Sequence, residues 1–294
     1  MASGEVNLVW LQGGGCTGCS VSLLNSAHPS TRNLLVDQLL PGVHLSLKYH
    51  PTVMAGQGQA ALSVLDDLPD GDFVLAVEGA IPDREEFCTI GEVDGREVTV
   101  KEKFLELAPK ASLVVAVGTC SSFGGISSGA PNPGGYRSAQ DVMDEAGVET
   151  PVVNVPGCPP HPDWISTTLL EYILAGGDAS KVAVDPLLRP LSIYGKLIHE
   201  NCPRRSYFDE GKFAEKPGDP ECLHKVGCKG PITYADCPLR EWNDGLNWCV
   251  KAGGPCQGCT QPEFIDMTTP IYVALEEDRL PKIGEGASVG GDDA

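Results

Sequence analysis

A short stretch near the start of the chain, Leu8–Cys19, constrains the fold more than any other feature of the sequence. It reads LVWLQGGGCTGC, an apolar run followed by three glycines and a C-x-x-C pair. The apolar run predicts a buried strand, and the glycines let the backbone turn sharply and approach a bulky group closely. Two interpretations of that group are open. A glycine-rich loop between a strand and a helix often binds a phosphate, whereas a C-x-x-C pair often binds a metal or an iron–sulfur cluster.

The first half of the chain alternates between apolar runs and segments of helical spacing. The apolar runs are Val6–Leu11, Val43–Tyr49, Phe73–Val77, Leu113–Val117 and Val152–Val155, and the helical segments include Ser20–Leu39, Gln59–Leu68 and Lys101–Ala108. This alternation predicts an α/β protein with a doubly wound parallel sheet. Ligands of such sheets bind beyond the carboxyl ends of the strands. Four unusual loops are expected there: GGGCTGC, EGAIP, GTCSSFGG and PGCPPHP.

The character of the sequence changes after Asp178. Apolar runs shorten, Pro, Gly, Trp and Cys become frequent, and seven of the twelve cysteines lie between Cys202 and Cys259. We therefore expect a sheet domain over residues 1–180 and an irregular domain over 181–294, the latter held by metal clusters rather than by a large core. The tail from residue 284 is rich in Gly and Asp, and we expect it to be flexible or extended.

The composition argues against two kinds of partner and favours one location. The formal net charge is −19, and 40 acidic side chains repel the phosphates of a nucleic acid. No apolar run approaches the ~20 residues that cross a bilayer. The start, MASGEVNLVW, has no charged n-region, apolar h-region or twin-arginine pair. We therefore expect a cytoplasmic protein, at most peripheral on the inner face of the cell membrane.

Twelve cysteines without an export signal indicate metal binding or redox chemistry rather than disulfides. The first set consists of Cys16, Cys19, Cys120 and Cys158, which follow three predicted strands. A parallel sheet brings such positions to one edge, and four thiolates suit a cubane cluster, whose irons each take one sulfur ligand. The set favours the metal interpretation of the first loop. The alternative is that Cys120 and Cys158 are buried core residues.

Two further sets lie in the second half. His199, Cys202, Cys222 and Cys228 form a ligand set that suits zinc or an iron–sulfur cluster with one histidine. His224 competes with His199 for the histidine position. The third set is Cys237, Cys249, Cys256 and Cys259, and Cys88 belongs to no set. Three such sets indicate an electron carrier, and no nucleophile elbow, Walker loop or dinucleotide fingerprint accompanies them.

Seven motifs, in order along the chain, resemble the small, electron-transferring subunit of nickel–iron hydrogenases. They are CTGCS at Cys16, VEGAIP at Val77, GTCSSFGGI at Gly118, PGCPPHP at Pro156, HENCPR at His199, GCKGP at Gly227 and AGGPCQGCTQPEF at Ala252. The resemblance runs from Val6 to Asp266. It implies a flavodoxin-like domain followed by a smaller, irregular cluster-binding domain. It also implies a hydrogenase whose catalytic nickel–iron centre lies in a separate large subunit, so that no catalytic residue is expected in this chain.

The resemblance assigns the ligands of three iron–sulfur clusters. Cys16, Cys19, Cys120 and Cys158 would hold a proximal [4Fe-4S] cluster, and His199, Cys202, Cys222 and Cys228 a distal [4Fe-4S] cluster. Cys237, Cys256 and Cys259 would hold a medial cluster between them. Many members have proline at the position of Cys249 and a medial [3Fe-4S] cluster. A fourth thiolate at this position favours a medial [4Fe-4S] cluster of lower potential, because it adds negative charge.

The partners implied by the resemblance are the large subunit and an electron acceptor, either a protein or a quinone. A higher oligomer of heterodimers and the direction of H2 oxidation (uptake) are also expected. Two alternatives remain. One is the related cluster-binding protein of a quinone-reducing respiratory complex, which shares the first cysteine set but lacks the second and third. The other is a zinc-stabilised binding module.

Overall fold

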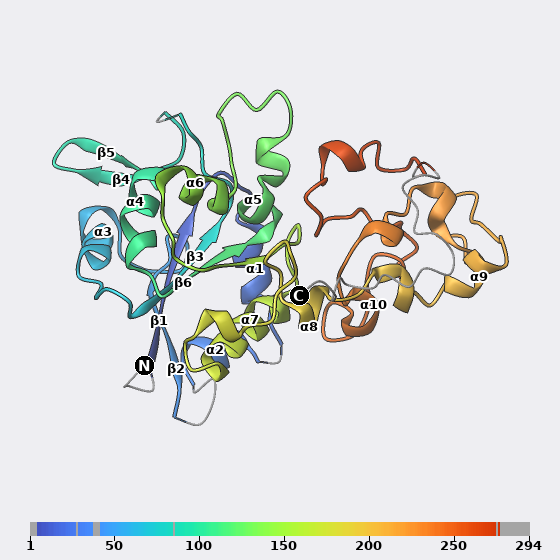
Figure 1. The fold of residues 1–294 in the computed structure, drawn as a ribbon, viewed down its shortest axis with the longest axis horizontal. Coiled ribbons are helices and arrows are strands. Elements are labelled where there is room, and N and C mark those ends of the chain that lie inside the picture. The colour runs from blue at the N-terminus through green and yellow to red at the C-terminus, as the bar shows by residue number, and fades with distance from the viewer. Residues whose placement is uncertain (1–4, 28, 38–41, 85, 275, 277–294) are drawn as a thin grey trace, which may run out of the picture. The chain divides into compact units, whose positions relative to one another are not determined.

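The computed structural model describes residues 5–27, 29–37, 42–84, 86–274 and 276. The chain divides into two compact units, residues 1–190 and 191–294. The tail from residue 284, for which flexibility is expected, lies outside the described residues. The first unit is built on a β-sheet, and the second consists of short helices and loops (Figure 1). Within the described ranges, no helix combines the length and apolarity required to span a membrane.

A five-stranded parallel sheet forms the centre of the first unit (Figure 1). The strands are β1 (Glu5–Gln12), β2 (His44–Tyr49), β3 (Phe73–Glu78), β6 (Leu113–Val117) and β7 (Val152–Val155). Each overlaps one of the five predicted apolar runs. Their order in the sheet, β2-β1-β3-β6-β7, is the 2-1-3-4-5 order of flavodoxin-like folds once the separate hairpin is left out. The predicted fold class is confirmed.

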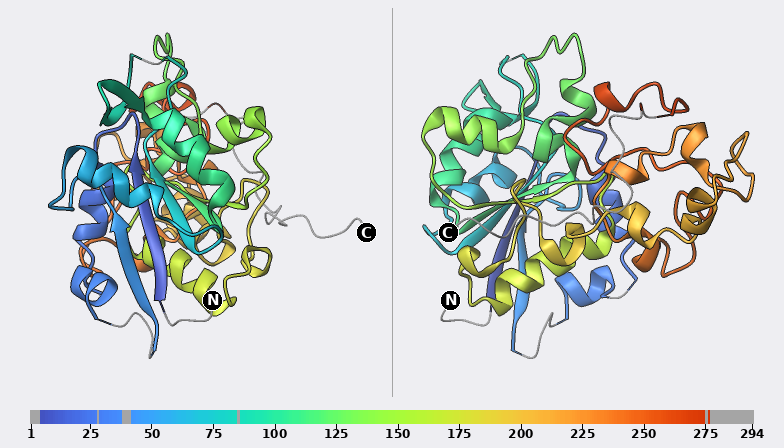
Figure 2. Two further views of the ribbon diagram at one scale, coloured as in Figure 1. Left: turned by 90° about the vertical axis from the view of Figure 1, so that its left-hand side faces the viewer. Right: turned by 45° about the vertical axis from the view of Figure 1, so that its right-hand side comes forward.

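Helices cover both faces of this sheet (Figures 1 and 2). Their bounds are α1 (Gly18–Leu24), α2 (Thr31–Leu35), α3 (Gly58–Asp66), α4 (Val100–Leu107), α5 (Gly118–Phe123), α6 (Ala139–Ala146) and α7 (Pro162–Leu174), and the hairpin consists of β4 (Thr89–Val93) and β5 (Arg96–Thr99). Val9 and Leu11 of β1 pack into a core cluster with α3, α4 and α6. Leu8 and Trp10 are equally buried, and because side chains alternate along a strand they face the other side of the sheet.

The segment Ser20–Leu39 forms two short helices, α1 and α2, instead of the single helical stretch expected. Ser30 begins α2 with a capping box: its side chain accepts from the Asn33 amide (3.3 Å), and the Asn33 side chain accepts from the Ser30 amide (3.1 Å). Pro29, just before this cap, has no N–H with which to continue a helix. Local capping chemistry therefore overrides the apolar spacing. Residues 28 and 38–41 lie outside the described ranges.

The second unit is held by short elements and side chains. Its α-helices are α8 (Leu191–Tyr194), α9 (Arg205–Asp209) and α10 (Cys237–Arg240). The 3-10 helices in the described part of the chain are η1 (Ala108–Lys110), η2 (Gly125–Ser128), η3 (Ala179–Lys181), η4 (Ile198–Asn201), η5 (Leu223–Val226), η6 (Gly230–Ile232) and η7 (Asp266–Thr268). The Arg204 guanidinium donates to the carbonyls of Asp219 (2.6 Å), Glu221 (2.9 Å) and Val250 (3.0 Å). One side chain thereby joins three stretches of loop.

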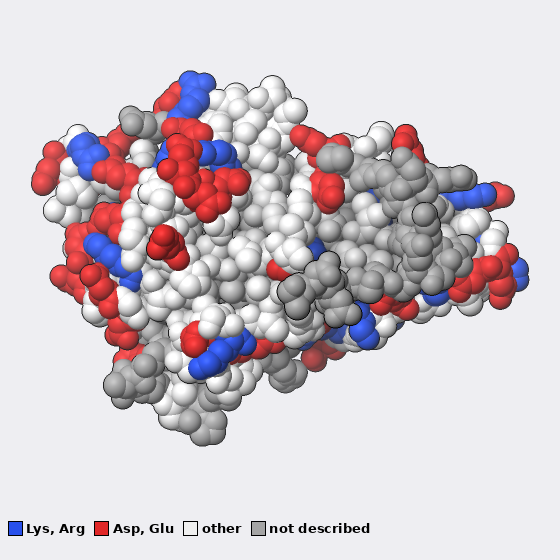
Figure 3. Space-filling model, viewed as in Figure 1, with Lys and Arg blue, Asp and Glu red and all other residues white. Residues whose placement is uncertain are grey.

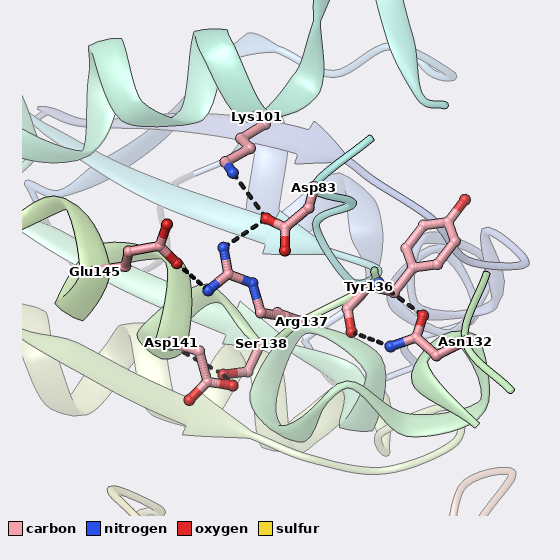
Figure 4. A network of polar contacts seen from close by, with 8 residues as sticks. All are labelled: Asp83, Lys101, Asn132, Tyr136, Arg137, Ser138, Asp141 and Glu145. Atoms are coloured by element: carbon pink, nitrogen blue, oxygen red, sulfur yellow. Dashed lines mark hydrogen bonds and ion pairs between the residues drawn. The ribbon is translucent and has the colours of Figure 1, made fainter. Parts of the chain in front are cut away.

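A polar network ties the loop between η2 and α6 to the loop that follows β3 (Figure 4). Arg137 forms ion pairs with Asp83 and Glu145, and Lys101 pairs with the same Asp83 (2.7 Å). Asn132 accepts a hydrogen bond from the Tyr136 amide (2.8 Å) and donates to its carbonyl (3.0 Å). These contacts fix the turn that carries Tyr136. They are partly exposed, so we assign them a positioning role rather than a large contribution to stability.

Charged side chains of both signs share the surface. On the face shown in Figure 3, basic side chains lie beside acidic ones and do not gather into a patch of their own. Arg96, for example, pairs with Glu102 (2.7 Å). A formal net charge of −19 disfavours binding to the phosphates of a nucleic acid.

We predict that Leu169→Ala destabilises the protein by about 2–5 kcal/mol, because it removes buried methyl groups and leaves a cavity. Leu169 lies on α7 and is 2% exposed. Leu174 on the same helix is 68% exposed, so Leu174→Ala is a matched control that we expect to change the free energy of unfolding by about 0.5 kcal/mol or less. Urea unfolding of the purified chain, followed by tryptophan fluorescence, measures both. Equal losses in the two variants would contradict the assigned packing of α7.

Candidate iron–sulfur cluster sites

The loops that follow β1 and β3 touch each other through their backbones. The amides of Gly13 and Gly14 donate to the carbonyls of Glu78 (2.7 Å) and Ala80 (2.8 Å), and the Ala80 amide donates back to Gly14 (3.0 Å). A Cβ on Gly13 would lie 2.5 Å from the Ala80 carbonyl oxygen, and one on Gly79, whose φ is +86°, would lie 2.9 Å from the Gly13 carbonyl carbon. The glycines of the first motif are therefore required by this close approach.

The four cysteines of the first set come together at this edge of the sheet. Cys16 and Cys19 follow β1, Cys120 lies on α5 directly after β6, and Cys158 follows β7. Burial raises the pKa of Cys19 well above its usual value, and the charges of Glu78, Cys120, Cys16 and Cys158 raise it further. All three other thiols of the set are thus close enough to Cys19 to act on it.

Glycines leave room beside these sulfurs. A Cβ on Gly118 would lie 2.5 Å from the Sγ of Cys19, and one on Gly125 would lie 3.0 Å from the Sγ of Cys120. Gly14 faces an aromatic ring instead of a sulfur. The ring of Tyr136 packs onto it, and a Cβ there would lie 2.1 Å from a ring carbon. The donor set and the small residues beside it fit a cubane cluster with four thiolate ligands.

A buried thiolate at Cys19 needs positive charge beside it. Burial and the neighbouring Glu78 raise the pKa of this thiol well above its usual value, so its thiolate form is costly without a cation. Iron in a cluster supplies that positive charge, and binding it releases the thiol proton. The surroundings of Cys19 are therefore compatible with a metal cluster at the first set.

The second set lines one pocket in the second unit. Its walls include the three cysteines and both candidate histidines of the set, together with Arg204: His199, Cys202, Cys222, His224, Cys228 and Arg204. The pKa of Cys228 is raised to about 11, mainly by burial, with backbone hydrogen bonds opposing the shift and Cys202 and Cys222 adding to it. The spacing of these residues in the sequence is wide, and the loops that Arg204 joins bring them together.

The two histidines of this pocket differ in their surroundings. The pKa of His199 is lowered to about 4, mainly by burial and then by Arg205 against the opposing charge of Asp209, so the ring is neutral at pH 7. Neutral imidazole is the form that binds metals. The ring of Phe208 packs edge-on against both His199 (4.6 Å between centroids) and His224 (5.6 Å). Of the two, His224 has a buried Nδ1 with no hydrogen-bond partner among the described residues.

The third set gathers around Cys237. Burial raises the pKa of Cys237, with Cys259 and Cys249 adding to the shift and a hydrogen bond with Trp242 opposing it. The pKa of Cys256 is raised by burial and then by Cys228, Cys259 and Cys237. Cys249 is thus a neighbour of Cys237, and it is exposed. The influence of Cys228 on Cys256 places the second and third sets next to each other.

The structure also bears on Cys88, the cysteine outside the three sets, and on zinc as an alternative to a cluster. Cys88 lies apart from the three sets, against the core cluster, with its Sγ 3.9 Å from the Tyr136 hydroxyl. Among the residues that the structure describes, no three His, Cys, Asp or Glu side chains are grouped so that they could hold a single metal ion. A lone zinc needs its ligands gathered tightly around one point, whereas a cluster spreads its ligands around four metal ions.

Three residues of these sites were not found by sequence reasoning. Glu78 ends β3, is 3% exposed and accepts a hydrogen bond from the Cys19 amide (2.9 Å). Arg204 joins the loops of the second set, and Lys229 is 3% exposed next to Cys228. For Glu78 a signal existed, because a carboxylate that closes an otherwise apolar strand is costly to bury without a purpose.

Two family models match the chain. Residues 16–172 match the family described as NADH ubiquinone oxidoreductase, 20 Kd subunit. Residues 194–272 match the family described as the C-terminal part of the NiFe/NiFeSe hydrogenase small subunit. The first match covers the first cysteine set and four of the five strands of the sheet, β1 lying before it, and the second covers most of the loops that hold the second and third sets.

Individual proteins similar to this chain are also hydrogenase small subunits, in agreement with the hydrogenase family match. The chain is 45% identical to the periplasmic [NiFeSe] hydrogenase small subunit of Desulfomicrobium baculatum over 91% of this chain and 87% of the relative. It is 38% identical to the periplasmic [NiFe] hydrogenase small subunit 1 of Nitratidesulfovibrio vulgaris over 90% and 81%. A solved structure of a reduced, active Ni-Fe-Se hydrogenase from Desulfomicrobium baculatum superimposes with a TM-score of 0.86 at 44% identity, covering 92% of this chain and 100% of that chain.

These comparisons correct the expected location. Both relatives are named as periplasmic proteins, so the expectation of a cytoplasmic protein, or of one on the inner face of the membrane, is wrong. The expectation depended on the lack of an export signal in MASGEVNLVW. Such signals are removed from mature proteins, and the composition of a folded chain does not reveal its compartment.

We predict that Gly118→Ala lowers the iron bound per chain by about four atoms, the content of one cubane, because the new Cβ would meet the Sγ of Cys19 at 2.5 Å. Gly147→Ala is the matched control: Gly147 also has a positive φ (+67° against +87°), but nothing lies within 4 Å of an added Cβ. Iron analysis of the purified variants, alongside circular dichroism, measures the effect. Equal iron in both variants would contradict the position assigned to Cys19.

Proposed function

Because the chain belongs to the NiFe/NiFeSe hydrogenase small subunits, we propose that its three cysteine sets hold three separate iron–sulfur clusters. The chain is an electron-transferring iron–sulfur subunit that pairs with a hydrogenase large subunit. Iron–sulfur clusters accept and release single electrons. The chain itself binds these groups and shields them, and the chemistry of H2 belongs to the nickel–iron centre of the large subunit.

The proximal [4Fe-4S] cluster is assigned to Cys16, Cys19, Cys120 and Cys158. The convergence of these thiols at the carboxyl edge of the sheet is the observation that carries this assignment. Cys16 is exposed, and on α1 beside it Val21 and Leu24 are 62% and 46% exposed. Exposed apolar side chains next to a cluster site are typical of a surface that a partner covers. We propose that the large subunit packs against this face.

The distal [4Fe-4S] cluster is assigned to His199, Cys202, Cys222 and Cys228, and the medial cluster to Cys237, Cys249, Cys256 and Cys259. The amide of Lys229, next to Cys228, donates to the carbonyl of Cys256 (2.8 Å). This hydrogen bond joins the backbone beside a distal ligand directly to that of a medial ligand. It supports an order in which the medial and distal groups are neighbours along the path of electrons.

We also propose the domain bounds, the electron acceptor, the assembly, the direction of reaction and the location. The domains over residues 1–180 and 181–294 would hold the proximal cluster and the other two clusters, respectively. The acceptor would be a protein or a quinone, and the complex a higher oligomer of heterodimers working in the direction of H2 oxidation. The names of the relatives favour a periplasmic location.

The related protein of a respiratory complex is a weaker candidate. The match to the NADH ubiquinone oxidoreductase family ends at residue 172, before the second and third sets begin. The match to the hydrogenase family over residues 194–272 includes seven of the twelve cysteines. The hydrogenase function accounts for those cysteines, and the respiratory function does not.

Co-expression with the large subunit tests the proposed function. We expect the purified complex to contain nickel and about 11–12 irons per small subunit, from four irons in each cubane and three or four in the medial cluster. We also expect H2-dependent dye reduction that disappears when the large subunit is omitted. Zinc in place of iron, or full activity of this chain alone, would contradict the proposal.

We predict that Cys249→Pro converts the medial group to a three-iron cluster with a raised potential, because one thiolate and its negative charge are lost. Iron content and EPR-monitored redox titration of the complex measure both changes. Cys88→Ala serves as the control, since Cys88 lies outside the three sets and its loss leaves the iron content unchanged. A [3Fe-4S] signal already present in the oxidised parent would show that Cys249 is not a ligand.

A further inference from the structure

A buried carboxylate lies directly behind the proximal site. Glu78 is 3% exposed and stands at the carboxyl end of β3, next to the loop that carries Cys16 and Cys19. Its Oε1 accepts hydrogen bonds from the amides of Cys19 (2.9 Å) and Ser20 (3.2 Å). Its Oε2 accepts from the Trp10 indole (3.0 Å), the Gln12 side-chain amide (3.1 Å) and the Ser20 hydroxyl. The carboxylate thus holds the first turn of α1 through the ligand Cys19 itself.

The tautomer of His50 determines which groups donate and which accept in the hydrogen bonds around Ser20. The amides of Thr52 (3.2 Å) and Val53 (3.3 Å) both donate to Nδ1 of His50, so the proton of the neutral ring is on Nε2. Nε2 then donates to the Ser20 hydroxyl oxygen (3.0 Å). The ring is 2% exposed and stacks on Trp10 (5.3 Å between centroids), so its orientation is fixed.

This arrangement leaves Glu78 in its ionised form. The Ser20 hydroxyl oxygen accepts from both His50 and the Gln12 side-chain amide (2.9 Å), so its own hydrogen points to Glu78. All five described donors to Glu78 then give a hydrogen and none accepts one. A protonated carboxyl would have to donate in turn, and none of these five contacts takes its proton. Charge-assisted hydrogen bonds of this kind are the stronger ones.

The charge acts on the proximal thiols. Because Oε1 of Glu78 accepts directly from the Cys19 amide (2.9 Å), a buried negative charge stands beside the residue whose thiol belongs to the first set. An electron added to a group bound at Cys19 would be repelled by this charge. No such carboxylate lines the described walls of the pocket formed by the second set, which instead contains Arg204.

We propose that Glu78, fixed by Ser20 and His50, is a positioning residue that orients Cys19 and lowers the reduction potential of the proximal cluster. The inference rests on the proposed function, because it requires a cluster at Cys19. With a lower reduction potential, the reduced proximal cluster gives up its electron more readily than it would beside a neutral Glu78. The effect needs no change in the ligands, since it comes from a fixed charge on the neighbouring strand end.

The test is an EPR-monitored redox titration of the purified complex with the large subunit, comparing wild type with Glu78→Gln. We expect the midpoint potential of the proximal cluster to rise in Glu78→Gln, and those of the medial and distal clusters to stay unchanged as internal references. Glu92→Gln is the matched control, since Glu92 is exposed on β4 and its substitution makes the same change in net charge. An unchanged proximal potential in Glu78→Gln with full iron content would overturn the inference.

Ser20→Ala gives an independent result if Glu78→Gln fails to load iron. Removing the hydroxyl takes away one donor that partly neutralises the carboxylate, so we expect the proximal potential to fall, opposite in sign to Glu78→Gln. No shift in Ser20→Ala would then overturn the inference. The wild-type complex separates this result from the proposed function, because a lack of three titrating clusters in the wild type contradicts the function and leaves no potential to compare.

Discussion

Hydrogen bonds between the loops at the carboxyl ends of the strands are the constraint on which the proximal site depends. The loops after β1 and β3 are joined through Gly14 and Ala80. Those after β6 and β7 are joined because Thr119 and Gly157 exchange hydrogen bonds (3.0 and 2.9 Å). The Ser127 hydroxyl then donates to the Gly14 carbonyl (2.6 Å) and links the two pairs. A parallel sheet brings four cysteines to one edge, and these contacts hold them at a fixed spacing.

The second unit depends on a different constraint. Its helices are short, and its loops are held by contacts such as those of Arg204 with three carbonyls. Two of its cysteines, Cys222 and Cys256, are buried. Their thiols contribute little hydrophobic energy, whereas as thiolates bound to iron they become cross-links between distant loops. On the proposed function, binding of the clusters and folding of this unit are therefore coupled.

The sequence was sufficient for the strands, because they follow from short-range patterns, whereas the grouping of the cysteines into cluster sites stays a prediction. Apolar runs marked each strand of the sheet, and the strand-end positions of Cys120 and Cys158 indicated that they join Cys16 and Cys19. It was not sufficient for the break between α1 and α2, where the Ser30 cap outweighs apolar spacing. Glu78 was missed for a related reason: its five donors come from β1 and α1, and no pattern within FVLAVEGAIP reveals them.

The charges that the fold places around the cluster sites differ in sign between the two units. Beside the first set lies Glu78, which opposes added negative charge. Beside the second set lies Arg204, which lowers the pKa of Cys202 against the larger effect of burial, whereas Arg205 is paired with Asp209 (2.9 Å). Arginine stays charged at any pH at which proteins fold, and Glu78 is held ionised by its donors. The negative charge of Glu78 beside the first site and the positive charge of Arg204 beside the second lower the potential of the first relative to the second. On the proposed assignment of clusters, the fixed charges of the chain therefore favour electron movement from the large subunit toward the distal site.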